Sequence, residues 1–313
     1  MSVLHSARAR ALACCVASVA ALGALVLAPP AGAAKLGNTY LALGDSLAYG
    51  YHQAQFRSEF PNVNPATFND GYVDDFGAAL KLANPKLQVI NDGCPGETTD
   101  AFLEGSGIPG FCSNFPAKTP FPDVWLHHPY GGSQLSDALA ILAANPNVSP
   151  ITIDIGSNDV LQFLGTHCGF PVTNTCGEAE VIAEYTHITA NVSSILATLH
   201  AAAPKAQIVL VGAYNPYPTV IPNGDKQLAR FAAMLAGAAA KVPGASFANS
   251  EPLFNPSGTF GGPEAGDIPT VCAFTAMCPG GTFNPASPEA DIHPTKLGYG
   301  VMAAVVGIDF LTH

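Results

Sequence analysis

Basic residues are scarce in this chain, which has 12 lysines and arginines against 23 aspartates and glutamates over 313 residues. Arg8 and Arg10 lie in the first segment, and without it 10 basic residues face 23 acidic ones, a formal charge of −13. Such a chain binds nucleic acid poorly and is repelled by anionic lipid. We therefore expect no nucleic-acid partner.

Long hydrophobic runs are also missing beyond the amino terminus. The one extended apolar stretch, residues 11–27, follows the two arginines and precedes "APPAGAA", where Ala31 and Ala33 have A-x-A spacing. This order is typical of a secretory signal peptide, and the stretch is short of the roughly 20 residues that a membrane-spanning helix needs. We expect residues 1–34 to be a signal peptide, the mature chain to be secreted into the extracellular space, and no stable membrane insertion.

Internal repeats, linker-like tracts and C-x2-C pairs are absent as well. We therefore expect residues 35–313 to form a single domain that is a monomer, with no metal site. His127 and His128 lie in a proline-rich loop, where we expect exposure to solvent.

Six cysteines follow the signal segment, and an even number in an exported chain favours disulfides. Neighbour pairing is the simplest connectivity among several: Cys94–Cys112, Cys168–Cys176 and Cys272–Cys278.

Apolar runs alternate with helical patterns along the mature chain. Strands are expected at 39–44, 87–92, 151–156, 207–214 and 245–250. Helices are expected at 72–82, at 133–144 with Ser133 as N-cap, at 179–202, at 225–242 and at 294–311, starting from Pro294. The strands are mostly continuous apolar runs rather than alternating ones, which indicates a parallel sheet covered by helices on both faces.

Polar groups follow the expected strands. "GDS" (44–46) follows the first strand, "NDGCPGET" (91–98) the second and "GSND" (156–159) the third, while "DIHP" (291–294) precedes the last helix. In open α/β sheets the loops beyond the carboxyl ends of the strands carry the functional groups. A hydroxyl, a glycine turn, an amide and an imidazole are therefore expected at one edge of the sheet.

These groups suit nucleophilic catalysis. Serine needs a base to take its proton and donors to hold the oxyanion that forms. His293 can be the base for Ser46. The backbone N–H groups of Ser46 and Gly96, together with the side-chain amide of Asn158, can be the donors, and glycine allows the backbone at position 96 to approach a substrate closely.

Several polar residues of these segments also have a structural interpretation. Ser46 can be a helix N-cap after a Gly-Asp turn. Asp45 is expected to tie its own turn through backbone donors. Asn158 and Asp159 can be a turn pair, and for Asp159 we favour support of the loop.

The four blocks, in this order, resemble the GDSL family of lipases and esterases, also called SGNH hydrolases. "GDSLAYG", "NDGCPGETT", "GSND" and "DIHPT" match the family's blocks, and the resemblance runs from about residue 38 to the last helix. It implies Ser46 as nucleophile, Gly96 and Asn158 as oxyanion residues and His293 as base. It also implies a three-layer α/β/α sandwich with a parallel, flavodoxin-like sheet of about five strands.

One position departs from the family pattern. The family usually has an aspartate three residues before the histidine, where this sequence has Ala290, with Asp291 two residues before and Glu289 four before. Either the local turn lets Asp291 reach the ring, or a backbone carbonyl near Ala290 accepts the ring N–H and leaves a Ser–His dyad. We favour the carbonyl, while keeping Asp291 among the candidate catalytic residues.

The sequence thus predicts a secreted serine hydrolase for small-molecule or lipid carboxylic esters, without a cofactor. A carbohydrate acetylesterase and a non-catalytic surface or glycan-binding protein on the same fold are the alternatives.

Residues 99–130 form a long expected loop with several aromatic side chains. It is either an acyl-binding wall or lid, or a satellite cluster stapled by Cys94–Cys112.

Overall fold

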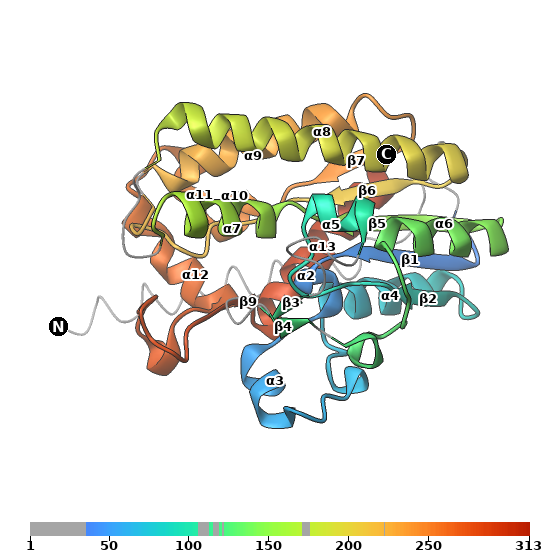
Figure 1. Ribbon diagram of the computed structural model, residues 1–313, viewed down its shortest axis with the longest axis horizontal. Helices are drawn as coiled ribbons and strands as arrows, with labels where there is room; N and C mark the ends of the chain where they lie inside the picture. Colours follow the sequence, from blue (N-terminus) through green and yellow to red (C-terminus); the bar gives the residue numbers. More distant parts are fainter. Residues whose placement is uncertain (1–35, 106–112, 115–118, 121, 171–175, 222) are drawn as a thin grey trace, which may run out of the picture.

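The computed structural model describes residues 36–105, 113–114, 119–120, 122–170, 176–221 and 223–313, so the predicted signal peptide lies outside the described residues. Five parallel strands form the central sheet in the order β2-β1-β5-β6-β7 (Figure 1). Counted along the chain this is the 2-1-3-4-5 order of flavodoxin-like sheets, as predicted. The strands are β1 Thr39–Gly44, β2 Gln88–Asn91, β5 Val148–Asp154, β6 Ile208–Val211 and β7 Ala245–Ala248.

The five long helices expected from the sequence are present. They are α4 Tyr72–Ala83, α6 Gln134–Ala144, α8 Glu178–Ala202, α9 Gly224–Ala239 and α13 Lys296–Thr312. Ser133 caps α6 by accepting a hydrogen bond from the N–H of Ser136, as expected. The expected start of the last helix at Pro294 is wrong, because Pro294 ends a strand and Thr295 is the N-cap.

Shorter elements fill the connections, and most of them were not expected. The helices are α2 Ser46–Tyr49, α3 Gln53–Glu59, α5 Thr99–Glu104, α7 Ser157–His167, α10 Glu251–Phe254, α11 Pro256–Phe260 and α12 Ile268–Phe274. In the described part of the chain, 3₁₀ turns lie at Pro65–Thr67, Asp123–Trp125, Glu264–Asp267 and Pro279–Gly281. Two small antiparallel pairs are β3 Ser113–Asn114 with β4 Thr119–Pro120, and β8 Thr275–Ala276 with β9 Asp291–Pro294.

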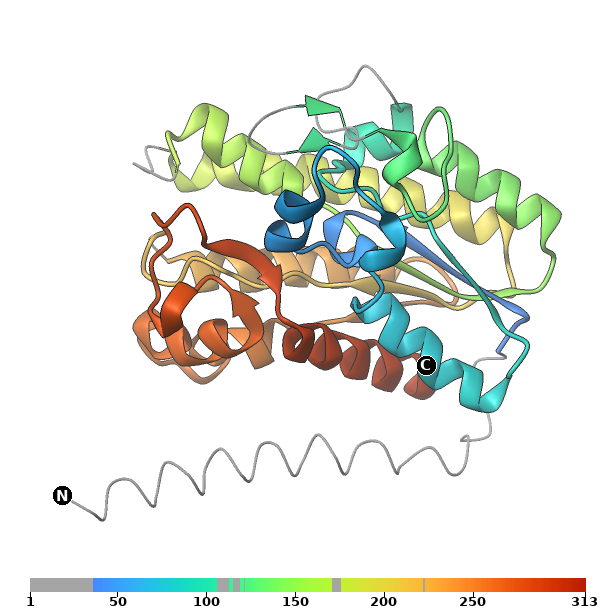
Figure 2. The ribbon, with the colours of Figure 1, turned by 90° about the horizontal axis from the view of Figure 1, so that it is seen from below.

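Helices cover both faces of the sheet, and strand alternation decides what each face meets. Along β1, Leu41 and Leu43 pack against α6, α8 and α9, whereas Tyr40 and Ala42 pack against α4 and α13. Figure 2 shows α4 and α13 on one side of the sheet and α6 and α8 on the other. Successive side chains of a strand point to opposite faces, so this continuous apolar strand serves two cores.

The topology also places the site. The connections reverse direction between β1 and β5, and ligands of open α/β sheets bind beyond the carboxyl ends of the strands at such a switch point. None of the described helices is both long enough and apolar enough to cross a bilayer.

Candidate active site

Ser46 lies at the tight turn between β1 and α2. Gly44 has φ of +128°, and a Cβ there would lie 2.1 Å from the carbonyl oxygen of Asp154, so only glycine fits. Asp45 is the N-cap of α2, because its Oδ1 accepts a hydrogen bond of 2.9 Å from the N–H of Leu47. The expected structural role of Asp45 is therefore confirmed, and the alternative in which Ser46 itself caps the helix is wrong.

Two buried residues that the sequence analysis did not single out fix this turn. The side-chain amide of Gln134 accepts from the N–H of Gly44 at 2.6 Å and donates to its carbonyl oxygen at 3.0 Å. Asp154 Oδ2 accepts from the N–H groups of Asp45 and Ala48 at 3.1 and 3.2 Å. An acidic residue inside the apolar run "ITIDIG" was the available signal for Asp154.

The imidazole of His293 faces the serine. Its Nε2 lies 2.9 Å from Ser46 Oγ, although 247 positions separate the two residues in the chain. His293 belongs to β9, whose backbone is held by the hydroxyl of Tyr214 donating to the carbonyl oxygen of Ile292 at 2.6 Å. The ring of Tyr51 packs against the imidazole, with centroids 4.7 Å apart. The ring is therefore held on more than one side.

Asp291 holds the other ring nitrogen, so the favoured expectation of a backbone carbonyl near Ala290 is wrong. Asp291 Oδ1 lies 2.5 Å from His293 Nδ1, and its Oδ2 accepts from the N–H of Gln53 at 2.8 Å. The reason is the strand conformation of β9, since residues two apart on a strand point to the same face. The shortened D-x-H spacing therefore still brings carboxylate and imidazole together.

The charge of Asp291 is favoured by its neighbours. Burial alone raises the pKa of this carboxyl group, but the positive charge of His293 and the hydrogen bonds from His293 and from the Gln53 backbone outweigh burial and leave its pKa below the usual value. Asp291 is thus a carboxylate at neutral pH.

The candidate oxyanion donors differ in their present partners. Gly96 has φ of +85° and follows Pro95 in a turn closed by the N–H of Glu97 donating to the carbonyl oxygen of Cys94 at 3.0 Å. Proline followed by glycine with positive φ is the type II pattern. Among the described residues, the backbone N–H groups of Ser46 and Gly96 have no hydrogen-bond acceptor.

The amide of Asn158, by contrast, is already bonded twice. Its Nδ2 donates to Asp45 Oδ2 and to the carbonyl oxygen of Glu97, both at 3.0 Å. Asn158 is the second residue of α7, a helix that was not expected, and it lines the same pocket as Ser46 and His293. The structure therefore brings the amide to the serine while tying it to two acceptors.

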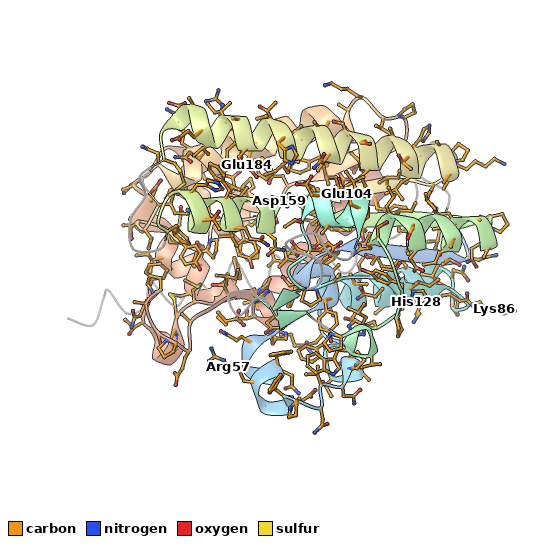
Figure 3. All side chains as sticks on the ribbon, viewed as in Figure 1. Arg57, Lys86, Glu104, His128, Asp159 and Glu184 are labelled. Carbon is orange, nitrogen blue, oxygen red and sulfur yellow. A yellow bond between two sulfur atoms is a disulfide. The ribbon has the colours of Figure 1, made fainter. Side chains whose placement is uncertain are left out.

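Asp159 supports the end of the loop that follows β2, which is the structural role favoured from the sequence. Both of its carboxylate oxygens accept from the N–H of Thr99 at 3.0 Å, and Oδ1 also accepts from the Thr99 hydroxyl at 2.5 Å. Asp159 lies in the first turn of α7 (labelled in Figure 3), and its side chain reaches Thr99, the first residue of α5. Burial raises the pKa of Asp159 to about 6 despite these donors.

A pocket opens beside Ser46 and encloses about 870 Å³, counting the space at its mouth. One wall is polar and contains Asp45, Ser46, Asn158 and His293. The remaining walls come from α7, α8, α9 and the segment between β6 and α9. Their side chains are largely apolar and include Val160, Leu161, Leu164, Tyr217, Ile221, Leu228 and Phe231.

Residues 99–130 contribute none of the described residues that line this pocket. Phe102 lies in the main core, and Trp125 packs edge-on against Phe56 and Phe60. Leu126 and Tyr130 join Tyr49 and its neighbours in a separate buried cluster, which favours the satellite-cluster alternative for the described part of this segment. Phe111, Phe115 and Phe121 lie outside the described residues, as does Cys112, the predicted partner of the buried Cys94.

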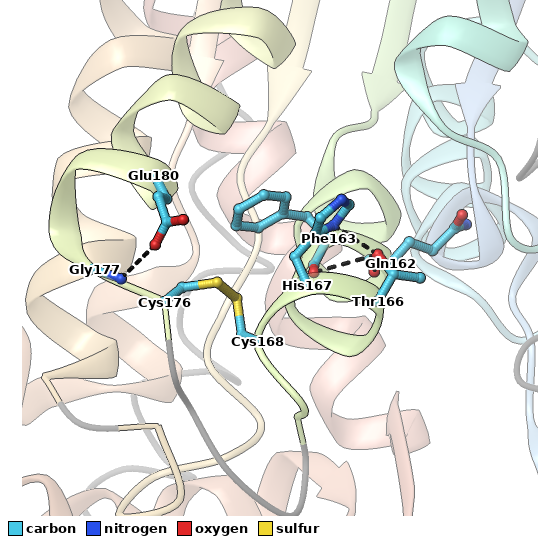
Figure 4. Close-up of a disulfide and its surroundings, with 8 residues drawn as sticks. All are labelled: Gln162, Phe163, Thr166, His167, Cys168, Cys176, Gly177 and Glu180. Carbon is cyan, nitrogen blue, oxygen red and sulfur yellow. Dashed lines mark hydrogen bonds between the residues drawn. A yellow bond between two sulfur atoms is a disulfide. The ribbon is translucent and has the colours of Figure 1, made fainter.

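Two of the three predicted disulfides are present, Cys168–Cys176 and Cys272–Cys278. Cys168 directly follows α7 and Cys176 precedes α8, where Glu180 accepts from the N–H of Gly177 at 2.8 Å (Figure 4). The first disulfide therefore joins two helices whose residues line the pocket.

Comparison with known proteins agrees with this fold. The model of the GDSL-like lipase/acylhydrolase family matches residues 42–301. The chain belongs to this family. No curated protein matches the chain by sequence.

Solved structures of related fold include the lipase Lip_vut3 from a goat rumen metagenome, with 18% identity, a TM-score of 0.52, and coverage of 87% of this chain and 95% of that chain. A catalytic mutant of Axe2, an acetylxylan esterase from Geobacillus stearothermophilus, has 14% identity and a TM-score of 0.47, with 88% and 96% coverage. An extracellular lipase from Streptomyces rimosus has 17% identity and a TM-score of 0.46, with 84% and 94% coverage. At these identities the likeness shows the fold alone.

Proposed function

We propose that this GDSL-family chain is a secreted serine hydrolase that cleaves carboxylic esters through Ser46 and His293. The observation that carries the proposal is the 2.9 Å contact between His293 Nε2 and Ser46 Oγ, with Asp291 on the opposite ring nitrogen. An imidazole held between a carboxylate and a hydroxyl is the arrangement that removes a proton from serine.

In the first half of the reaction, Ser46 Oγ attacks the carbonyl carbon of the ester while its proton passes to His293 Nε2. The oxyanion that forms accepts hydrogen bonds from the N–H groups of Ser46 and Gly96 and from the amide of Asn158. The bond to the alcohol oxygen then breaks, and His293 gives its proton to the departing alcohol. The acyl group stays on Ser46.

In the second half, water attacks the acyl carbon and gives its proton to His293. The carboxylic acid departs as the bond to Ser46 Oγ breaks, and His293 returns the proton to that oxygen. Asp291 holds the Nδ1 hydrogen of the ring throughout and stabilises the imidazolium. None of these steps uses a cofactor.

Asn158 must exchange a partner during this cycle. Its two amide hydrogens serve Asp45 and the carbonyl oxygen of Glu97, so an oxyanion takes the place of one of these acceptors. A bond formed only once the oxyanion exists favours the transition state over the bound substrate. The N–H groups of Ser46 and Gly96 need no such exchange.

The pocket walls support an ester with an apolar acyl chain. Leu161, Leu164 and Phe231 offer hydrocarbon surface, which stabilises a buried acyl chain by the hydrophobic effect. A sugar would bring hydroxyl groups that need hydrogen-bond partners on those walls. The pocket therefore favours a lipase or esterase over a carbohydrate acetylesterase, and the serine–histidine contact argues against a non-catalytic binding protein.

Secretion is supported by the two disulfides, which persist in oxidising compartments, and by the signal-peptide pattern of residues 1–34. Expression of the full chain in a bacterial host should release a protein whose mass corresponds to a start near residue 35. Retention of an intact amino terminus inside the cell would contradict this part of the proposal.

The catalytic proposal is tested by Ser46→Ala with p-nitrophenyl esters of increasing chain length. The variant should lose hydrolysis and covalent labelling by a fluorophosphonate, while circular dichroism stays unchanged. Ser157→Ala is the matched control, because Ser157 lines the same pocket without a contact to His293. Hydrolysis that persists in Ser46→Ala, or an activity maximum at acetate, would contradict the nucleophile or the acyl preference respectively.

A further inference from the structure

A second cluster of aspartate and histidine lies outside the pocket. Asp92 directly follows β2, His128 precedes α6 (labelled in Figure 3), and Asp137 lies in the first turn of α6. His128 Nδ1 lies 2.9 Å from Asp92 Oδ1 and 3.2 Å from Asp137 Oδ2. Three residues from separate parts of the chain thus direct an imidazole nitrogen and two carboxylates to one point.

The two carboxylates have too few donors. Asp92 has no exposed surface, and its Oδ2 has no hydrogen-bond partner among the described residues. The atom Asp137 Oδ2 is also buried and has no hydrogen-bond partner among the described residues, because the single hydrogen of His128 Nδ1 is already donated to Asp92. A buried carboxylate oxygen without a donor costs stability. In the described part of the chain, His128 is the one cationic side chain that forms an ion pair with either carboxylate.

The spacing of these atoms suits a metal ion. One ligand atom from each residue lies within 4.8 Å of the other two. Ligands about 2.1 Å from a common cation lie roughly 3.0 Å apart in octahedral and 3.4 Å apart in tetrahedral geometry. The contacts of 2.9 and 3.2 Å at His128 Nδ1 need little rearrangement to reach those values.

We propose that Asp92, His128 and Asp137 bind a divalent transition-metal cation, with zinc as the best fit. Imidazole with carboxylates suits zinc and its neighbours, whereas calcium and magnesium prefer oxygen ligands alone. The side chains of His128 and Asp137 are 41% and 20% exposed, so the ion can enter from solvent and water can complete its coordination. The proposal differs from the expectation, drawn from the sequence, that the chain carries no metal site.

The cation acts on structure rather than on the chemical step. None of the three residues lines the pocket around Ser46, so the inference does not depend on the proposed reaction. Bound metal joins α6 to the chain directly after β2, four positions before Gly96. It therefore stabilises the turn that presents the Gly96 N–H, and it supplies the positive charge that the two carboxylates lack.

The test uses the mature protein stripped with EDTA and then titrated with zinc chloride by calorimetry. We expect one zinc per chain with a Kd in the micromolar range or below. At zinc concentrations about 100 times the Kd, the Tm should rise by about 5 °C, while calcium and magnesium should leave it unchanged. X-ray absorption at the zinc edge should show one imidazole with oxygen ligands and no sulfur.

Two variants on half-exposed side chains, His128→Gln and Asp137→Asn, should each raise the Kd by about 100-fold or more. His187→Gln is the matched control, because His187 Nε2 also pairs with a carboxylate, that of Asp100 at 3.1 Å, but belongs to no three-residue ligand group among the described residues. That control should bind zinc as the wild type does.

The absence of zinc binding would overturn the proposal. So would affinity that survives both variants, or affinity that is lost in His293→Gln instead, since the ion would then sit at the proposed catalytic histidine. The absorption spectrum of the wild type decides the question even if a variant fails to fold, because sulfur or two imidazoles around zinc rules out this ligand set.

Discussion

Asp291 and Asp92 each contact a histidine ring nitrogen from a buried position, yet their surroundings differ. Asp291 accepts from the Gln53 backbone as well as from His293, and its pKa is lowered although burial acts to raise it. Asp92 has one oxygen without a donor and a second carboxylate beside it, and burial raises its pKa to about 6. The number of donors and the sign of the nearest charge decide whether a buried carboxylate stays ionised.

The largest effect is expected from removing the charge of Asp291, the carboxylate with more hydrogen-bond donors. Asp291→Asn should lower kcat by about 10,000-fold with little change in KM, because the amide cannot hold the correct tautomer of His293 or stabilise its positive charge. Steady-state hydrolysis of a p-nitrophenyl ester measures this. Asp100→Asn, in the pair with His187, is the control. A loss below about tenfold would mean that Asp291 is not needed to orient the ring.

The next prediction moves the carboxylate to the usual family position. Ala290→Asp combined with Asp291→Ala should stay at least about 1,000-fold below the wild type in kcat. Position 290 directly precedes β9, so it does not share the two-residue spacing that places Asp291 and His293 on one face of the strand, and we expect a carboxylate there to point away from the imidazole. Recovery of activity in the double variant, relative to Asp291→Ala alone, would show that this segment does not keep its strand conformation during the reaction.

A smaller effect is expected at Asn158, whose amide, like Asp291, already has its partners in place. Asn158→Ala should lower kcat by about 100-fold, the loss typical of one oxyanion donor. The same variant should change KM much less, since the bond to the oxyanion forms only after attack. An unchanged kcat would leave Asn158 with a purely structural role between Asp45 and Glu97.

The smallest effect concerns stability and tests whether donors alone keep a buried carboxylate ionised. Asp159 has donors from Thr99 and forms no ion pair among the described residues, and its pKa is raised to about 6. The folded state therefore binds the proton more tightly than the unfolded state, and this contribution is complete below about pH 4 and lost as the pH rises through 6.

Relative to Asp159→Asn, the wild type should lose roughly 2 kcal/mol of unfolding free energy between pH 4 and pH 7. Urea denaturation of both proteins across this range measures the difference. A difference that does not vary with pH would show that the Thr99 donors hold the charge of Asp159 without help.

The sheet and its long helices could be predicted because their signals are local. Apolar runs such as "TYLALG" and the helical periodicity of residues 179–202 mark elements whose ends lie close to those observed. Helix α7 was not predicted from the sequence, because its first turn, Ser157 to Asp159, is polar and resembles a loop. The apolar residues Val160 and Leu164, four apart on one side of it, were the signal available.

The geometry at Asp291 could not be predicted from the spacing alone. It depends on the pairing of β9 with β8, two short segments that show no strand pattern of their own. The pocket walls were missed for a similar reason. Tyr217 and Ile221 belong to an irregular segment after β6, and only the packing of α7 and α9 around them forms a cavity. Contacts between distant segments leave no periodic trace in the sequence.

The double hydrogen bond between Gln134 and Gly44 has a mechanical consequence. It couples the first residue of α6 to the backbone two residues before Ser46, and Asp137 lies in the same first turn of this helix. We expect a displacement of α6 to shift the turn that carries Ser46, because the Gln134 side chain that joins them is fully buried. We therefore expect ligands or crosslinks on this helix to change the rate of turnover without entering the pocket.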